Sequence, residues 1–477
     1  ITRWDLSKPV DLANLVLMTL EEAQQHHAAA QQTGSLPQSV LDVLKAHQSG
    51  KNQENEKICQ IHEILQRLRE HLVASYEGLG RGFMAVKDSF PVAADPHPKH
   101  PPDAIDPSTS ERSSAWSIPS RPSFGGLVGE TKLVELRCLS EATNCKIFGK
   151  AEFLSPGGCQ KDRVARHIVD EAVATGALCK GGTIVEGTSG STGISLCLAA
   201  AALGYKVHVV MPDDQADEKV ELLKCLGATV QMVRPASISS PEHYVNVARK
   251  HAEKLNAENG RGAALFANQF ENPANFRAHY ETTGPELWQQ CPGLDAFVMS
   301  AGTGGTLAGV GRFLKEKSSK IRIVLADVPG SSLYYKVAKG VLYAPEQEER
   351  SVRRHRQDTI AEGIGNARLT GNFAMGLPEH NGGIPGVDSA VRVSDQEALE
   401  MAHHLLRHEG VFLGSSAAVN CVAAVKVART LPPKSNVVTI LCDSGQRHLT
   451  KFYNSAVWPD YNLEAPVKHA PEDLSFA

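Results

Sequence analysis

Two glycine-rich segments, residues 187–193 and 302–306, constrain the fold of this 477-residue chain more than any other feature. Each follows an apolar run and precedes a helical pattern. For the second segment, residues 296–299 predict a buried strand and residues 306–315 predict a helix. A glycine turn from a strand into a helix leaves free backbone amides at the positive end of the helix dipole, and such amides bind phosphate. The two segments therefore predict an α/β protein with an anion-binding turn.

The second segment has competing interpretations. A dinucleotide-binding turn requires a third glycine after Gly302-x-Gly304, but Leu307 stands at that position. A Walker loop would end in Gly-Lys followed by Ser or Thr, which this segment lacks. A tight packing turn without any ligand stays open for this loop taken by itself.

Strand and helix patterns alternate through the later part of the chain. One strand, helix, strand unit consists of residues 183–186, 191–203 and 207–211. Residues 437–441 predict a further strand, and Ser394 and Glu397 form a capping box that opens a helix ending at Leu406. Such alternation is typical of parallel sheets with helices on both faces, in which ligands bind at the carboxyl ends of the strands.

One lysine lies directly after a glycine turn, where backbone geometry fixes its position. Lys161 follows Gly157 and Gly158 and precedes the helical pattern of residues 164–174. Taken alone, such a lysine is most often a solvated residue at a helix start. A fixed amine together with two glycine-rich turns, however, is what an aldehyde cofactor bearing a phosphate requires. The combination therefore predicts pyridoxal phosphate.

The order and spacing of these motifs resemble the cysteine synthase and cystathionine β-synthase family of fold-type II pyridoxal-phosphate enzymes. The resemblance covers about residues 125–453. Residues 128–134 are similar to the family's Ile-Gly-Asn-Thr-Pro-Leu-Val, residues 156–163 to its Pro-Gly-Gly-Ser-Val-Lys-Asp-Arg, and residues 443–447 to its Asp-Ser-Gly-Glu-Arg. The resemblance implies an α/β fold of two parallel-sheet, three-layer domains with the cofactor between them.

The resemblance also implies roles for individual residues. Lys161 falls on the catalytic lysine, which holds the cofactor as a Schiff base and then acts as the base for the substrate α-proton. The other implied cofactor-binding residues are Ser191, Gly302, Thr303, Gly304, Gly305, Thr306, Gly363 and Ser416. The implied substrate-binding residues, which hold the carboxylate, are Thr188, Ser189, Gly190, Thr192 and Gln269.

The chain departs from the family pattern at three places. Ser191 stands where the family has an asparagine that reaches the ring hydroxyl of the cofactor, and a serine is shorter and has one donor. Cys159 replaces a serine two positions before the lysine, and the family's Ser-Ser-Gly is Ser416-Ala417-Ala418 here. The lysine and the phosphate turn are unaffected by these changes.

The implied activity is β-replacement, in which O-acetylserine or a related β-substituted alanine reacts with sulfide or a thiol to give cysteine. Two alternatives stay open: a β-eliminating cysteine desulfhydrase or serine dehydratase-like lyase, and an inactive cofactor-binding scaffold. The family is usually dimeric, so a homodimer is expected. A net charge of −4 provides no basic patch for nucleic acid, and the scattered cysteines predict no metal site.

The sequence also predicts how the chain is divided. A helical leader with a heptad-like apolar seam, for which a protein partner is expected, precedes a proline-rich linker. The predicted regions are the leader 1–87, the linker 88–123, a larger cofactor domain 124–160 and 291–460, a smaller domain 161–290, and a loose tail 461–477. Ten cysteines without disulfide-like spacing favour a reducing compartment and thus an intracellular location, cytoplasmic or mitochondrial.

Overall fold

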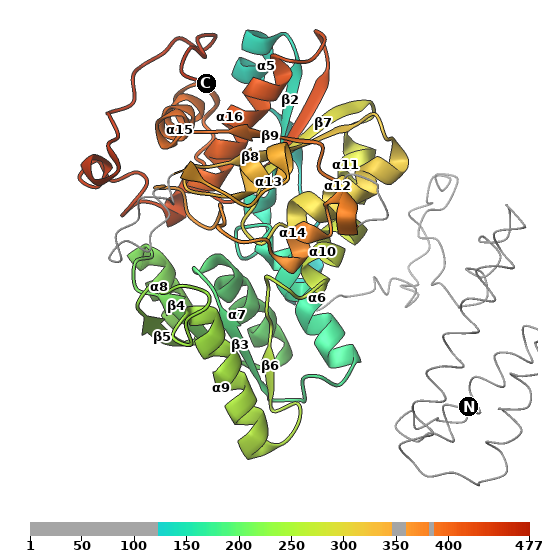
Figure 1. Cartoon of the computed structure of the whole chain (residues 1–477), viewed down its shortest axis with the longest axis vertical. Coiled ribbons are helices and arrows are strands. Elements are labelled where there is room, and N and C mark those ends of the chain that lie inside the picture. Colours follow the sequence, from blue (N-terminus) through green and yellow to red (C-terminus); the bar gives the residue numbers. More distant parts are fainter. Residues whose placement is uncertain (1–122, 346–358, 381–385) are drawn as a thin grey trace, which may run out of the picture. The chain divides into compact units, whose positions relative to one another are not determined.

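The computed structural model describes residues 123–345, 359–380 and 386–477, and two β-sheets organise this part of the chain (Figure 1). The predicted leader and all of the predicted linker except Ser123 lie outside the described residues. Among the helices that are described, none has the length and apolar character needed to cross a membrane.

The larger sheet has six strands in the order β1-β2-β10-β7-β8-β9. Their bounds are β1 Leu133–Glu135, β2 Lys146–Ala151, β7 Leu294–Ser300, β8 Arg322–Asp327, β9 Ser389–Arg392 and β10 Asn436–Leu441. All neighbouring pairs are parallel except β1 and β2, so the predicted parallel sheet carries one antiparallel edge strand. Helix α16 (Ser415–Ala428) packs on β10 and β7 beneath α15 (Asp395–Glu409), and every residue of α16 except Lys426 is buried. Burial on all sides explains its run of alanine and valine.

The smaller sheet has four parallel strands in the order β5-β4-β3-β6. Their bounds are β3 Thr183–Gly187, β4 Lys206–Pro212, β5 Thr229–Val233 and β6 Ala264–Phe266. Successive residues of β3 face opposite sides: Ile184 packs in the core beside α7 (Ser191–Leu203), and Val185 packs beside α9 (Tyr244–Asn259). The sheet therefore lies between helices, and the predicted α/β fold of parallel sheets is confirmed.

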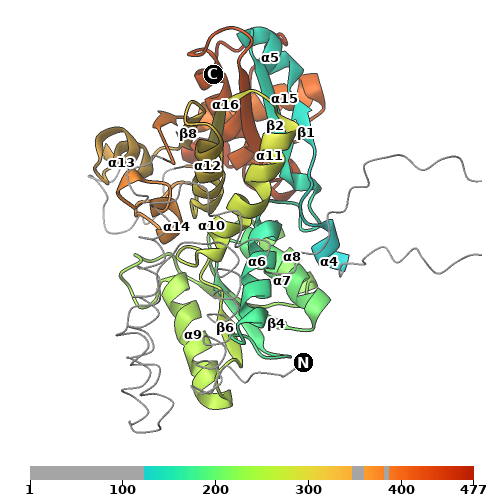
Figure 2. The ribbon, with the colours of Figure 1, turned by 90° about the vertical axis from the view of Figure 1, so that its right-hand side faces the viewer.

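The remaining helices connect and cover the two sheets. They are α4 Ser123–Leu127, α5 Arg137–Thr143, α6 Lys161–Ala174, α8 Asp217–Cys225, α10 Ala274–Ala278, α11 Gly284–Gln290, α12 Gly305–Lys317, α13 Leu333–Lys339 and α14 Gly371–Ala374. Figure 2 shows α6 and α10 where the two sheets meet, and these two helices contact each other. The region between the two sheets therefore contains helices and loops, and no strand of either sheet passes through it in the described part of the chain.

The predicted capping box of α15 is present. The Ser394 hydroxyl accepts the Glu397 N–H at 3.2 Å, and the Glu397 carboxylate accepts the Ser394 N–H at 2.7 Å. The helix continues to Glu409, three residues beyond the predicted end at Leu406, because Gly410 with φ 67° provides the left-handed residue that ends it.

The cores correct the predicted domain boundaries at two places. Phe124 and Val128, assigned from sequence to the larger domain, pack in the core of the smaller sheet. Leu287 of α11, assigned to the smaller domain, packs in the core of the larger sheet. Both segments are short and lie next to a domain boundary, and their apolar residues carry no signal about which sheet they cover.

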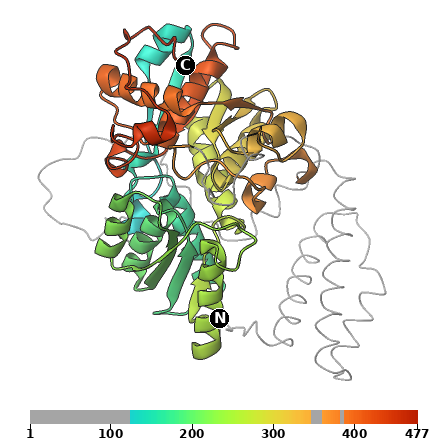
Figure 3. The same ribbon diagram turned by 60° about the vertical axis from the view of Figure 1, so that its left-hand side comes forward.

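The C-terminal residues 461–477, predicted to be a loose tail, contact the larger domain instead (Figure 3). Arg407 donates to the Val467 carbonyl at 2.8 Å, and Arg429 donates to the Leu474 carbonyl at 2.7 Å. Leu474 is buried, and the Phe476 ring packs against His404 of α15. Two apolar side chains among polar neighbours anchor this segment, and its polar composition concealed them.

Candidate active site

A cavity of about 580 Å³ opens where the carboxyl ends of β3 and β7 face each other. Both domains contribute to its wall. The predicted site residues that line it are Lys161, Thr188, Ser189, Ser191, Thr192, Gln269, Gly302, Thr303, Gly304, Thr306, Gly363 and Ser416. Gly190 and Gly305 are buried just behind this wall. The structure therefore gathers the predicted residues, which span more than two hundred positions, around one cavity.

Lys161 is the first residue of α6 and lines the cavity. The turn before it is fixed because the Gly157 N–H donates to the Asp162 carboxylate at 2.6 Å. A Cβ on Gly157 would lie 2.2 Å from the same carboxylate, so the turn requires glycine there. Burial lowers the pKa of the Lys161 amine, which favours the neutral form that can attack an aldehyde or accept a proton.

Residues 302–306 lead from β7 into α12, as the sequence predicts. Gly304 has φ 83°, and a Cβ there would lie 2.4 Å from Phe373. A Cβ on Gly302 would lie 2.1 Å from the Gly363 carbonyl oxygen, and one on Gly305 would lie 2.1 Å from Asn275. Because three of its residues are glycines, the loop packs tightly against these neighbours. The first backbone amides of the thirteen-residue helix α12 have no hydrogen-bond partner within the helix. This turn has the geometry of a phosphate site.

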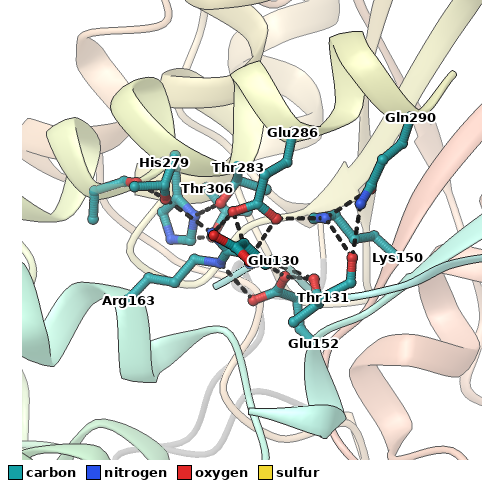
Figure 4. Close-up of polar contacts among 12 residues, drawn as sticks. Glu130, Thr131, Lys150, Glu152, Arg163, His279, Thr283, Glu286, Gln290 and Thr306 are labelled. Atoms are coloured by element: carbon teal, nitrogen blue, oxygen red, sulfur yellow. Dashed lines mark hydrogen bonds and ion pairs between the residues drawn. The ribbon is translucent and has the colours of Figure 1, made fainter. Parts of the chain in front are cut away.

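Neighbouring side chains hold the phosphate turn in place. Asn275 donates to the Thr303 hydroxyl at 2.8 Å, and Thr370 donates to the Thr303 carbonyl at 2.7 Å. The Thr306 hydroxyl lies 3.1 Å from Nε2 of His279 (Figure 4). Burial, reinforced by the charge of Lys161, holds the pKa of His279 well below its usual value, so its ring is neutral at physiological pH.

The loop between β3 and α7 lines the same cavity as the turn at 302–306. The Thr188 hydroxyl accepts the Gly190 N–H at 3.2 Å, and Gly190 has φ 128°, a conformation that only glycine adopts without strain. Thr192 donates to the Gln269 side-chain oxygen at 2.6 Å. The Gln269 N–H in turn donates to Glu186, and burial raises the pKa of that carboxyl to about 8. The loop presents hydroxyls and amides suited to a carboxylate.

Ser415 and Ser416 have separate partners. The Ser415 hydroxyl accepts the Glu362 N–H at 3.1 Å, whereas Ser416 lines the cavity and is 7% exposed. Ser416 is therefore the serine available to a ligand, as expected for the cofactor-binding residue that the family resemblance implies.

Beneath the cavity, Arg163 of α6 joins the two domains through a buried ion network (Figure 4). Its guanidinium donates to Glu152 at 2.8 and 2.9 Å and to Glu286 of α11 at 2.6 and 2.8 Å. Lys150 pairs with the same Glu286 at 2.7 Å. The network anchors the first turn of α6, which carries Lys161, to the larger domain.

A cluster of charged residues in the cavity wall was missed by the sequence analysis. Glu362 directly precedes Gly363 in the cavity wall, and it is surrounded by Lys219, His448 and Lys451. Lys219 precedes Glu362 by 143 positions, and neither residue belongs to a recognisable spacing motif with the other. Only the implied cofactor-binding role of Gly363 and the motif at residues 443–447 pointed to this region.

Comparison with known proteins agrees with this geometry. Residues 125–443 match the family model for pyridoxal-phosphate dependent enzymes. The chain is 47% identical to cysteine synthase 2 of Schizosaccharomyces pombe over 74% of this chain and 87% of the relative. It is 50% identical to cysteine synthase 2 of Neurospora crassa, over 73% of this chain and 76% of the relative. A relative with "mitochondrial cysteine synthase" in its name, from Saccharomyces cerevisiae, is 48% identical over 71% and 85% of the two chains.

Solved structures give the same result. O-ureido-L-serine synthase matches with a TM-score of 0.58 at 29% identity, over 72% of this chain and all of that one. An O-acetylserine dependent cystathionine β-synthase from Helicobacter pylori matches with a TM-score of 0.58 at 29% identity, over 69% and 97% of the two chains. With Lys161, the turn at 302–306 and the loop at 188–192 around one cavity, the chain belongs to the pyridoxal-phosphate dependent enzymes, in the cysteine synthase and cystathionine β-synthase family.

Proposed function

We propose that this enzyme forms cysteine by β-replacement, using sulfide as the nucleophile and O-acetylserine as the amino-acid substrate. The observation that carries the proposal is that Lys161 lines one cavity with both the phosphate turn at 302–306 and the hydroxyl-rich loop at 188–192. Sequence identities of 47 and 50% to two fungal cysteine synthases support the same reaction.

The residues of the cavity fit pyridoxal phosphate. The amides of the phosphate turn would hold the phosphate, Lys161 would hold the aldehyde carbon, and Ser416 would face the ring nitrogen. When bound, this cofactor withdraws electrons from the α-carbon of the amino acid. The protein then has to orient the substrate and move protons.

The chain's own groups perform these two tasks. Thr188, Ser189, Thr192 and Gln269 would bind the substrate carboxylate through hydroxyls and amides, which fixes the α-carbon in position. The amine of Lys161 would take the α-proton. Burial lowers the pKa of this amine, so more of it is uncharged near neutral pH and able to accept a proton. With the carboxylate held, the bond between the β-carbon and the ester oxygen can break so that acetate leaves, and sulfide can form the new bond to the β-carbon.

Titration of the cofactor-loaded protein with O-acetylserine, L-serine and L-cysteine, followed by product analysis with sulfide present, tests this proposal. Cysteine is expected as the main product from O-acetylserine. Pyruvate and ammonia as main products would contradict it in favour of β-elimination. A protein that binds the cofactor but turns over none of the three would contradict it in favour of a binding scaffold.

Replacing Gly304 with alanine is expected to weaken cofactor binding about five- to a hundred-fold. The new Cβ would meet Phe373 at 2.4 Å with φ at 83°, and strain of this kind costs about 1–3 kcal/mol. Equilibrium dialysis with pyridoxal phosphate measures the effect. Gly340→Ala is the matched control, since Gly340 has φ 78° but no atom within 4 Å of a new Cβ. Equal affinity in the two variants would contradict the prediction.

Replacing Ser191 with asparagine is expected to increase β-replacement on O-acetylserine roughly five- to a hundred-fold. Asparagine would restore a hydrogen bond worth about 1–3 kcal/mol to the ring hydroxyl. Ser191 is the first residue of α7 and lines the cavity, so a longer amide there extends toward the ligand rather than into the core. Steady-state rates on a series of acyl-serines measure the change. Equal or slower rates on all of them would mean that Ser191 is suited to another substrate.

We also propose that the enzyme is an intracellular homodimer, in the mitochondrion or the cytoplasm. The cysteines of the described residues are all free, as is usual in a reducing compartment. The name of the Saccharomyces cerevisiae relative supports the mitochondrion. Light scattering of the purified protein and fractionation of cells test these two points; a monomer or a secreted protein would contradict them.

A further inference from the structure

The first turn of helix α8 is fastened to the larger domain on two sides. The Thr450 N–H donates to Glu218 at 2.7 Å, and the Thr450 hydroxyl donates to the other oxygen of the same carboxylate. On the cavity side, Lys219 pairs with Glu362 at 2.7 Å, and the Ala216 N–H reaches Glu362 at 3.4 Å. Helix α8 belongs to the smaller domain, so these contacts link the two domains beside the cavity.

Lys219 connects this link to the loop at residues 188–192, which is called the carboxylate-binding loop from here on because it would bind the substrate carboxylate. Its side chain packs directly against Gly190: a Cβ on that glycine would lie 2.9 Å from Cδ of Lys219. Lys219 is 3% exposed, and its amine is held by the ion pair with Glu362. The loop at Gly190 therefore rests on a lysine whose position depends on Glu362.

Glu362 is in turn held by His448. Nδ1 of His448 lies 3.3 Å from Glu362, and Nε2 lies 3.0 Å from Asp443. A Cβ on Gly414, the residue before α16, would lie 2.1 Å from Asp443 and 2.6 Å from His448, so both side chains are seated against the start of that helix. His448 is 2% exposed and bridges two carboxylates.

The charges of His448, Glu362 and Lys219 favour their mutual attraction. Burial opposes the charged form of His448, but Asp443 and Glu362 outweigh it and raise the pKa of the imidazole above its usual value. Burial likewise opposes ionisation of Glu362, yet Lys219 and His448 hold the pKa of this carboxyl well below its usual value. Lys451 adds a third cation at 3.7 Å from Glu362.

We propose that His448 is a positioning residue that acts through Glu362 and Lys219 to hold the carboxylate-binding loop at Gly190 in place for the amino-acid substrate. The inference rests on the proposed function, because it assigns that loop to the substrate carboxylate. His448 lines the cavity, but its two ring nitrogens lie against Glu362 and Asp443. Its effect is transmitted to the loop by the His448–Glu362 and Glu362–Lys219 ion pairs and by the packing of Lys219 on Gly190.

His448→Phe tests the proposal, because phenylalanine keeps the ring and removes both nitrogens. The expected result is a KM for O-acetylserine raised about ten-fold, as for the loss of a charged hydrogen bond, with kcat within about three-fold of the parent. Hydrogen exchange of the amides of residues 188–193 should be faster in the cofactor-loaded protein without substrate. The matched control is His208→Phe: His208 lies on β4, outside the cavity wall, bonded to Gln231. It should change neither quantity.

A second pair of variants keeps the test decisive if His448→Phe does not fold. Lys219→Met keeps the stem that packs on Gly190 and removes the ion pair, whereas Lys219→Arg keeps the charge. The proposal requires raised KM and faster exchange in Lys219→Met, with recovery in Lys219→Arg. Unchanged exchange of residues 188–193 in His448→Phe, or in Lys219→Met where that variant replaces it, would overturn the proposal. A lower kcat at unchanged KM would also overturn it. Exchange is measured without turnover, so failure of the proposed reaction leaves this result interpretable.

Discussion

Replacing Lys161 with alanine is expected to lower turnover of O-acetylserine about a thousand-fold or more while the chain stays folded. Lys161 has two tasks, attachment of the cofactor and removal of the α-proton, and a positioned base alone contributes about a hundred- to ten-thousand-fold. Its side chain extends into the cavity from the first turn of α6, so truncation removes no core packing. Steady-state kinetics and the visible absorbance of the protein measure the loss.

A matched control and a chemical test accompany this prediction. Lys180→Ala removes an exposed lysine from the loop after α6 and should leave turnover unchanged. Borohydride treatment followed by peptide mapping should place the cofactor on Lys161 in the parent protein only. A cofactor found on the same peptide in Lys161→Ala, or a turnover within ten-fold of the parent, would contradict the assignment.

Replacing Arg163 with methionine is expected to destabilise the protein by about 3–5 kcal/mol. Arg163 is 1% exposed and is bonded to two carboxylates, and Glu152 is fully buried. Methionine fills a similar volume but removes the positive charge that pairs with Glu152. Glu286 would keep its ion pair with Lys150. An uncompensated buried charge is far more costly than a missing pair. Urea unfolding followed by tryptophan fluorescence gives the free energy of unfolding.

The neighbouring Arg166 provides the control for this experiment. It lies on the same helix, pairs with the exposed Asp170 at 3.4 Å and donates to the Gly125 carbonyl at 3.0 Å, and its side chain is partly exposed to solvent. Arg166→Met should therefore cost less than about 1 kcal/mol. Adding Glu152→Gln to Arg163→Met should recover part of the loss, because the stranded charge is removed. Equal stabilities of the two single variants would show that the network contributes only as a surface pair does.

The sequence was sufficient to predict the elements that carry their own local signal. Strands 183–186 and 207–211 and helix 191–203 are present as β3, β4 and α7, with strand ends extended by one residue. Each is bounded by a glycine or by a change in the spacing of apolar residues, and such signals depend only on neighbouring residues. The turn at 302–306 also carries a local signal in its three glycines, although the atoms that would clash with a Cβ there belong to the distant residues Gly363, Phe373 and Asn275.

What could not be predicted depends on contacts between distant segments. Lys219, Glu362 and His448 read separately as ordinary charged residues, and only the fold brings them together. The tail was misjudged because two apolar residues, Leu474 and Phe476, decide its position within an otherwise polar stretch. The segments at Phe124 and Leu287 were misassigned because an apolar residue does not specify which of two sheets it will cover.

Helix α6 has a consequence for how such an enzyme tolerates motion. Its middle packs in the core of the smaller domain through Val164 and Ile168, while Arg163 ties its first turn to the larger one. An element that two domains both hold is displaced less by a shift of one domain against the other than an element that only one of them holds. Lys161, two positions from Arg163, stands on such an element. Any such shift would therefore move its nitrogen less than it moves the loops that a single domain carries.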